Sequence, residues 1–304
     1  MPEVITSPSN PKVKQLLALQ QKSSARRERG LFVVEGRREL QHCIDAGFEI
    51  DTVFYCPSLE APSGSAPLQN FALRVHPSQP GGWAPPVYEA TGGHGFAGAA
   101  AATVDASRDG HQTRIIEVSK EVYAKVSYRE GTEGIIAEVR VPERKLDGLV
   151  LPENPLVVVL ESVEKPGNLG AVLRSADAAG ADAVLVCDPL TDLWNPNLIR
   201  ASIGAAFTVP TVACSTEEAI AFLQARGIRI LTAQLQDSSL YYDCDMTVGT
   251  ALVMGTESTG LTDRWRQAAD AHIRIPMLGR LDSLNVSVSA AILLFEAVRQ
   301  RSNG

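Results

Sequence analysis

The segment PGNLGAVLRSADAAG, which follows the apolar run LVVVL, contains the first residues that could carry chemistry. Asn168 supplies an amide, and Arg174 supplies a guanidinium, a group that keeps its charge in proteins. Apolar residues recur with helical spacing from Leu169 to Ala176, which places Arg174 on the opposite face of a helix. Taken alone, Asn168 is explained by a helix cap and Arg174 by a surface cation.

Two further polar clusters follow apolar runs later in the chain. In LVMGTESTGL, Gly255 and Glu257 occupy a tight loop, where a glycine lets a ligand approach the backbone and where a simple turn would look the same. In RLDSLNVSVS, the polar residues Ser283, Asn285 and Ser287 precede a helix. Three polar residues within five positions are more than one helix cap requires.

The elements that must position these clusters alternate between apolar runs and helical segments after residue 155. LVVVL, AVLVC, IRILTA, ALVMG and HIRIP predict strands, and helices are expected near 169–179, 197–204, 216–225 and 285–301. Strands that are apolar on both faces predict an α/β fold with a parallel sheet covered on both sides. All three polar clusters follow such strands, where open α/β sheets bind ligands. The expected core face of the last helix consists of Val288, Ala291, Ile292, Phe295 and Val298.

The N-terminal part predicts a smaller α/β domain, residues 1–144. A helix is expected in NPKVKQLLALQQK, strands in LFVVEG, DTVFYC, TRIIEVS and GIIAEVR, and another helix at 37–46. A Pro-, Gly- and Ala-rich stretch at about 57–112 predicts a loop-rich insertion. Residues 145–154 are expected to form a linker to a second domain at 155–304.

Charge is distributed unevenly along the 304 residues. The formal net charge is -7, yet eight Lys and Arg residues against two Glu lie between Lys12 and Arg38. Lys and Arg neutralise nucleic-acid phosphates, so this stretch is a candidate RNA contact; a solvated helix face is the alternative. The candidate RNA-binding residues are Lys12, Lys14, Arg26, Arg27 and Arg29.

Composition narrows the class of protein. Hydrophobic residues make up 45% of the chain, no apolar run reaches about 18 residues, and the first residues are polar. Five scattered cysteines without a CxxC pair, and histidines without metal-ligand spacing, indicate reduced thiols and no metal site. We therefore expect a cytoplasmic protein that does not enter a membrane.

A competing motif suggests a nicotinamide-dependent oxidoreductase. Gly93, Gly95 and Gly98 spell GxGxxG, with Glu117 at a spacing suited to a dinucleotide ribose. The preceding PPVYEAT is not a buried strand, and a Gly- and Ala-rich stretch produces such spacings by chance. We interpret this motif as a loop.

The three polar clusters, in this order and spacing, resemble the three signature motifs of the SpoU, or TrmH, family of RNA ribose 2′-O-methyltransferases. The resemblance covers about 145 residues from Leu156, and residues 7–39 resemble more loosely that family's small RNA-binding domain. It implies a trefoil knot in the C-terminal part of the sheet, a homodimer formed through the methyltransferase domain, and S-adenosylmethionine bound in the knot.

The resemblance also implies roles for individual residues. The catalytic set is Arg174, Asn168, Glu257 and Ser287. The cofactor-binding set is Gly255, Ile275, Met277, Leu284 and Asn285. Lys165 departs from the pattern, because many members have an acidic residue before the proline.

The expected reaction is methyl transfer from S-adenosylmethionine to a ribose 2′-hydroxyl of structured RNA, with large-subunit (23S) ribosomal RNA as the favoured substrate. The same chemistry on transfer RNA, or an RNA-binding protein without catalysis, are the alternatives. The methylated nucleotide and any role in antibiotic resistance do not follow from the sequence.

Overall fold

The computed structural model describes residues 3–59, 113–128, 134–256 and 260–302. The chain forms two compact units, Met1–Val141 (unit 1) and Pro142–Gly304 (unit 2). Most of the expected insertion, the three glycines of the GxGxxG motif and Glu257 lie outside the described residues.

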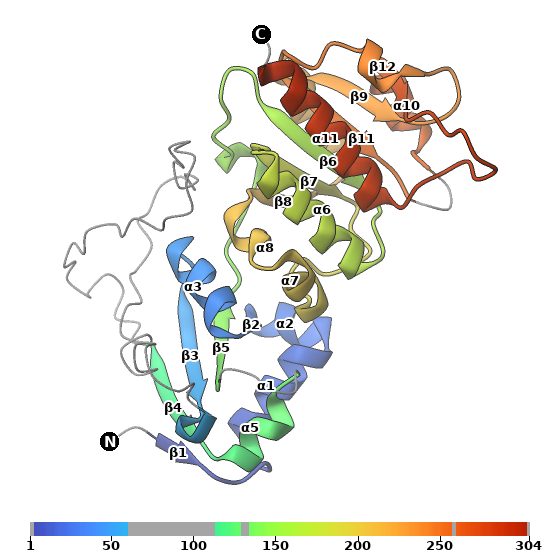
Figure 1. Ribbon diagram of the computed structural model, residues 1–304. Helices are drawn as coiled ribbons and strands as arrows, with labels where there is room; N and C mark the ends of the chain where they lie inside the picture. Colours follow the sequence, from blue (N-terminus) through green and yellow to red (C-terminus); the bar gives the residue numbers. More distant parts are fainter. Residues whose placement is uncertain (1–2, 60–112, 129–133, 257–259, 303–304) are drawn as a thin grey trace. The chain divides into compact units, whose positions relative to one another are not determined.

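Unit 1 contains a five-stranded mixed sheet in the order β1-β4-β3-β5-β2 (Figure 1). β1, β4 and β3 run parallel, whereas β5 is antiparallel to both β3 and β2. The strands are β1 (Glu3–Ile5), β2 (Leu31–Glu35), β3 (Ile50–Tyr55), β4 (Arg114–Val118) and β5 (Ile135–Arg140). The helices are α1 (Pro11–Gln21), α2 (Ser23–Arg29), α3 (Arg37–Asp45) and α5 (Lys120–Val126).

The sequence specifies the start of α1 locally. Asn10 is the N-cap, its side-chain oxygen accepts a hydrogen bond from the Lys12 N–H at 2.9 Å, and Pro11 occupies the first helical turn. Val13, Leu16 and Leu19 are buried in a core shared with β4 and α5. The helix expected in this segment is therefore confirmed.

Unit 2 contains a seven-stranded sheet in the order β10-β12-β9-β11-β6-β7-β8, and every pairing is parallel. The strands are β6 (Leu156–Glu161), β7 (Ala183–Cys187), β8 (Thr211–Cys214), β9 (Arg229–Ala233), β10 (Ser239–Leu240), β11 (Thr250–Met254) and β12 (Ala271–Arg274). The helices are α6 (Pro166–Ala178), α7 (Pro196–Ser202), α8 (Ala205–Thr208), α9 (Thr216–Ala225), α10 (Asp263–Ala268) and α11 (Val286–Ser302). The sequence analysis did not specify α8, α10, β8 or β10.

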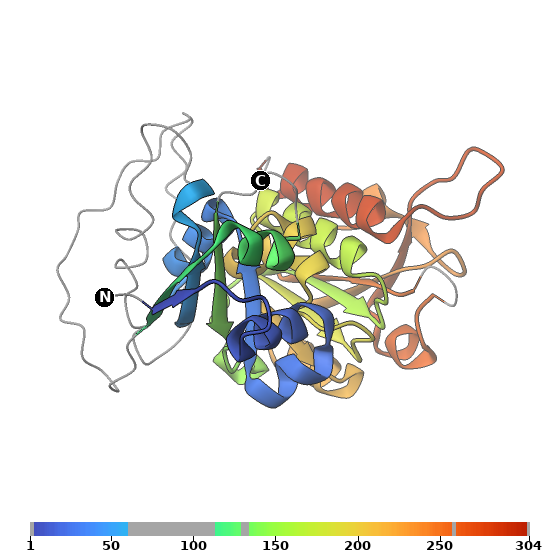
Figure 2. The same cartoon turned by 90° about the horizontal axis from the view of Figure 1, so that it is seen from below.

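Both faces of this sheet are covered, as the apolar strands predict. Val158 and Leu160 belong to a core with α6, α8 and α11, whereas the alternate residues Val157 and Val159 belong to a core with α9 and α10. Figures 1 and 2 show α6 and α11 side by side along one face. The polar loops at the strand ends are thus supported from both sides.

The predicted core face of α11 is wrong. The structure buries Val286, Ala290, Leu293, Leu294 and Ala297. Val288 and Phe295 are instead 47% and 49% exposed. This helix carries apolar residues on several sides, so spacing alone could not identify the side that packs.

Residues 145–154 do more than connect two domains. They include a 3-10 turn, Leu146–Gly148, and Leu146, Leu149 and Leu151 pack half-buried against the core under α9 and α10. None of the helices in the described part of the chain is long and apolar enough to cross a membrane.

Candidate active site

A cavity of about 380 Å³ opens where β9, β11 and β12 end. Its walls come from the loops that follow these three strands and from the first turn of α11. Parallel strands place such loops at one edge of the sheet. The volume falls within the range of about 300–1,000 Å³ that is typical of small-molecule sites.

Four of the five predicted cofactor-binding residues line this cavity: Gly255, Ile275, Met277 and Leu284. They come from two loops, one after β11 and one between β12 and α11. The fifth, Asn285, does not line it but lies next to Leu284 at the start of α11. The structure therefore brings together residues that are about 30 positions apart in the chain.

Gly255 is required by its own loop. A Cβ at this position would lie 2.2 Å from the Gly260 carbonyl oxygen and 2.6 Å from the Leu261 nitrogen. Thr256 and Gly260 close the loop with two backbone hydrogen bonds of 3.2 and 3.1 Å, and Gly260 has a φ of +69°. We expected a glycine that lets a ligand approach; the structure shows a glycine that lets the backbone turn back on itself.

Glu161, at the end of β6, holds this loop in place through hydrogen bonds. Its role was not predicted from the sequence. It is 3% exposed and accepts hydrogen bonds from the Thr262 N–H at 2.9 Å, the Thr262 hydroxyl at 2.7 Å and the Thr216 hydroxyl at 3.3 Å. Thr216 begins α9, and its hydroxyl is also 2.7 Å from an Asp188 oxygen. The only sequence signal was a carboxylate at the end of an otherwise apolar strand.

Asn168 does not cap α6, contrary to one expectation. Pro166 takes the first helical position, which suits its fixed backbone angle, and Asn168 is the third residue of the helix. The Asn168 side-chain oxygen accepts a hydrogen bond of 3.2 Å from the Asn285 amide. Asn285 in turn accepts bonds from the Ser287 N–H at 3.0 Å and the Ser287 hydroxyl at 2.6 Å, so it joins the starts of α6 and α11.

A smaller cavity of about 140 Å³ adjoins the larger one. Val163, Lys165 and Asn168 line it on one side. It shares Gly255, Thr256 and Val286 with the larger cavity. Asn168 therefore faces a space next to the cofactor cavity.

Arg174 lies on the exposed face of α6, opposite Val172 and Leu173, as its spacing predicts. It is eight positions after Pro166, about 12 Å along the helix, and it lines neither cavity. It has no hydrogen bond or ion pair with any residue that the structure describes. The structure thus brings Asn168, Asn285 and Ser287 together but leaves Arg174 apart from them.

Comparison with known proteins identifies the family to which this chain is similar. Residues 155–295 match the SpoU rRNA Methylase family, and residues 10–76 match the MRM3-like substrate binding domain. The 23S rRNA (guanosine-2′-O-)-methyltransferase RlmB of Vibrio vulnificus is 39% identical over 175 residues, which span 56% of this chain and 71% of that enzyme. The chain belongs to the SpoU rRNA methylase family.

Other SpoU-type proteins are similar over different lengths. The 23S rRNA (uridine(2479)-2′-O)-methyltransferase of Streptomyces viridochromogenes is 35% identical over 58% of this chain, and the alignment spans 63% of that enzyme. A crystal structure of an RNA 2′-O ribose methyltransferase covers 98% of this chain and 99% of its own, at 34% identity and a TM-score of 0.73. The AdoMet-bound rRNA methyltransferase of Sinorhizobium meliloti covers 98% of this chain and 97% of its own, at 27% identity and a TM-score of 0.79.

In this SpoU family member, the predicted RNA-binding cations of unit 1 differ in exposure. Lys14, Arg27 and Arg29 are exposed, and Lys12 is half-buried in an ion pair with Glu3.

Arg26 corrects the prediction. It is 3% exposed, and its guanidinium donates to the carbonyl oxygens of Leu19 at 2.5 Å and Gln20 at 3.4 Å. These carbonyls belong to the last turn of α1, where helix carbonyls lack partners within the helix. Arg26 therefore stabilises the end of α1 and, being buried, does not offer its guanidinium to RNA.

Proposed function

We propose that the protein transfers a methyl group from S-adenosylmethionine to a ribose 2′-hydroxyl of 23S ribosomal RNA. The observation that carries this proposal is the cavity at the ends of β9, β11 and β12, lined by Gly255, Ile275, Met277 and Leu284. The names of the relatives support the reaction and the RNA. The residues that would hold the cofactor are thus in one place.

The donor set of the cavity fits this cofactor. Met254, Leu261 and Ile275 offer an apolar surface for the adenine, and Gln234 and Asp282 offer polar groups for the ribose and the charged amino-acid part. Bound there, S-adenosylmethionine supplies a methyl group on a positively charged sulfur. Sites of this kind combine an apolar lining with a few polar groups that fix orientation.

Alignment of the ribose is the main task left to the protein, because correct positioning of two reactants can supply much of the rate. Asn168 faces the smaller cavity and is oriented by Asn285, so we assign it to the ribose. Glu257 and Ser287 are proposed to support this arrangement.

Arg174 is proposed to bind an RNA phosphate and to orient the hydroxyl. A guanidinium stays protonated in proteins, so it is a poor general base, but its planar fork binds phosphate well. Its exposed position on α6 leaves it accessible to RNA.

We further propose a homodimer formed through unit 2. Val288 and Phe295 are exposed on α11, and Ala291, Ile292 and Val298 are half-buried on the same helix. An exposed apolar stripe of this kind is typical of an interaction surface, and a second copy would cover it. Replacing Val288 and Phe295 with Glu is expected to convert a dimer into a monomer in sedimentation velocity; an unchanged dimer would contradict this interface.

Three finer assignments belong to the same proposal. The N-terminal domain, residues 1–144, binds the RNA substrate, which the match of residues 10–76 to a substrate-binding domain supports. The C-terminal part of unit 2 forms a trefoil knot, an arrangement compatible with β11 lying between β9 and β6. The protein works in the cytoplasm, where its ribosomal RNA substrate would be available.

The test is methyl transfer from isotope-labelled S-adenosylmethionine to unmodified 23S rRNA and to transfer RNA, followed by nucleotide-resolution mapping of the product. We expect one 2′-O-methylated nucleotide in 23S rRNA. Methylation of transfer RNA alone would replace the substrate, and binding of RNA without transfer would favour the protein without catalysis. Failure to bind S-adenosylmethionine in calorimetry would overturn the cofactor assignment.

A further inference from the structure

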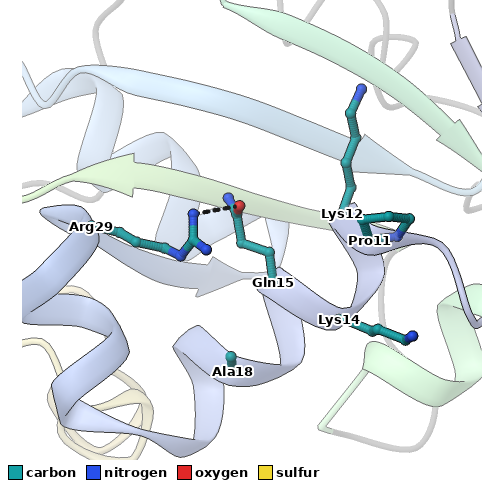
Figure 3. Close-up of a pocket in the computed structure, with 6 residues that line it drawn as sticks. All are labelled: Pro11, Lys12, Lys14, Gln15, Ala18 and Arg29. Carbon is teal, nitrogen blue, oxygen red and sulfur yellow. Dashed lines mark hydrogen bonds between the residues drawn. The ribbon is translucent and has the colours of Figure 1, made fainter.

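Unit 1 contains a groove of about 400 Å³ whose lining includes the predicted RNA-binding residues Lys12, Lys14 and Arg29. It lies along α1 and reaches the end of α2 (Figure 3). Its lining consists of Pro11, Lys12, Lys14, Gln15, Ala18 and Arg29, three cations and no carboxylate. The groove therefore favours an anion.

Arg29 is held in place at the edge of this groove. Its Nη1 donates a hydrogen bond of 3.0 Å to the Gln15 side-chain oxygen, and Figure 3 shows the two side chains pointing toward one another. The amide nitrogen of Gln15 donates at 3.0 Å to Glu138, which is 1% exposed on β5. Both ends of the Gln15 amide are thus fixed, and Gln15 presents its oxygen to Arg29.

The rest of the Arg29 guanidinium is available to a ligand. Arg29 is exposed, and among the described residues Gln15 is its one hydrogen-bond partner. A guanidinium has five N–H donors in a planar fork, so several remain for a bidentate contact with a phosphate.

The two lysines contribute differently to the groove. Lys14 is exposed and has no ion-pair partner in the described part of the chain, whereas Lys12 is paired with Glu3. Figure 3 shows both lysines extending away from Arg29 and Gln15. Lys14 therefore adds positive charge to the groove, and Arg29 supplies the contact that is held in a fixed orientation.

We propose that this groove binds one phosphodiester of the substrate RNA, with Arg29 as the phosphate-binding fork and Gln15 as the residue that positions it. The inference rests on the proposed function, because it assumes that unit 1 receives RNA. An acidic peptide would offer similar anions; RNA is favoured because the groove lies within residues 10–76, which match a substrate-binding domain.

Lys125 provides a control. It is an exposed cation of the same unit, in the last turn of α5, and it does not line the groove. Both side chains can be shortened to Ala at exposed positions, where substitutions usually change stability little. A difference between the two variants then reports on the groove and not on total charge.

The experiment measures binding of the full chain to an unmodified 23S rRNA transcript at several KCl concentrations. Arg29→Ala is expected to weaken binding by about 5- to 10-fold and to lower the slope of log affinity against log salt by about 0.7–0.9, whereas Lys125→Ala should weaken it by less than about 2-fold. Arg29→Lys should keep the slope but not the affinity, since lysine keeps the charge and loses the fork. Gln15→Ala should also keep the slope and lower the affinity by about 3-fold, through loss of one orienting hydrogen bond.

The outcomes separate this inference from the proposed function. If the wild-type protein binds and methylates the transcript while Arg29→Ala matches Lys125→Ala, the groove assignment alone fails. Full rescue by Arg29→Lys would show that charge suffices without the fork, which also overturns it. Polyglutamate that displaces RNA from the wild type but not from Arg29→Ala would assign the groove to acidic peptides. A wild-type protein that neither binds nor methylates RNA would overturn both proposals.

Discussion

Glu161 of unit 2 and Glu138 of unit 1 are both buried, and the two carboxylates are held very differently. Glu161 in unit 2 accepts three hydrogen bonds, two from Thr262 and one from Thr216. Glu138 in unit 1 accepts one from Gln15, and its Oε1 has no hydrogen-bond partner in the described part of the chain. Burial raises the pKa of Glu138 to about 7, and the negative charge of Asp51 adds to this effect.

The difference between the two glutamates follows from what each carboxylate holds in place. In unit 2, the buried carboxylate fastens the loop that shapes a cavity, so the polar groups are satisfied inside the protein. In unit 1, the chain from Glu138 through Gln15 to Arg29 ends at the surface, with donors left for an external anion. A small-molecule site needs rigid walls, whereas an RNA-binding surface needs cationic side chains that phosphates can reach.

Arg174 of unit 2 is exposed and is not part of a cavity wall. Changing it should have the largest effect on the rate of methyl transfer. Arg174→Ala is expected to spare cofactor and RNA binding but to lower the transfer rate by a factor on the order of 10² or more, the scale of a positioned catalytic group. Arg174→Lys should restore little, because the planar fork is lost. Single-turnover methyl transfer measures both; near-normal activity in Arg174→Ala would remove this residue from the catalytic set.

A substitution at Gly255 tests whether the loop after β11 forms a rigid wall of the larger cavity. Even Gly255→Ala places a Cβ against the Gly260 backbone, and overpacking typically costs about 1–3 kcal/mol, so S-adenosylmethionine affinity should fall about 5- to 100-fold. The larger Gly255→Arg should bind at least as weakly. Calorimetry gives the affinity, with Gly167→Ala as the control, since its Cβ would meet nothing within 4 Å. Unchanged affinity in Gly255→Arg would refute the cofactor site.

A substitution at Glu161 tests whether its hydrogen bonds with Thr262 hold the loop in place. Glu161→Gln replaces an oxygen acceptor with an amide, and hydrogen bonds to charged groups contribute about 1.5–3 kcal/mol, so the KM for S-adenosylmethionine should rise about 10-fold. The kcat at saturating cofactor should change less, because Glu161 lines neither cavity. Thr262→Val should reproduce a smaller part of the effect, since it removes one donor. A fall in kcat with KM unchanged would contradict a positioning role.

Glu138 is expected to affect stability and not the transfer reaction, and its effect is a pH dependence of the free energy of unfolding. The folded carboxyl keeps its proton up to about pH 7, whereas in the unfolded chain it loses the proton near its ordinary value of 4.5. The folded state therefore binds more protons between these values, and this group lowers stability as pH rises through that window, by at most about 1.4 kcal/mol per pH unit.

Glu138→Gln should remove this slope from the urea-unfolding transition of unit 1 and stabilise it at pH 8 relative to wild type. Glu28→Gln, at an exposed position of α2, is the control and should leave the slope unchanged. If Glu138→Gln unfolds with the wild-type pH dependence, the raised pKa of Glu138 is not the cause of that dependence.

Many of the local elements, and four of the residues that line the larger cavity, could be predicted from the sequence. The spacing from Leu169 to Ala176 predicted which face of α6 is buried and that Arg174 is exposed, because helical periodicity is a local property. The apolar strands predicted the parallel sheet, and the motifs predicted Gly255, Ile275, Met277 and Leu284 as neighbours. These features are encoded in residues that are close in sequence or in recurring motifs.

Other features depend on contacts between segments that are distant in the sequence. Glu161 meets Thr216 and Thr262 across 55 and 101 positions, and Arg26 reaches the carbonyl oxygens of α1 because α2 folds back beside it. The packing side of α11, which has apolar residues on several faces, was set by the neighbouring α6 and β11. Charge and hydropathy describe what a side chain can do, but its burial and its partners depend on which distant segments the fold places against it.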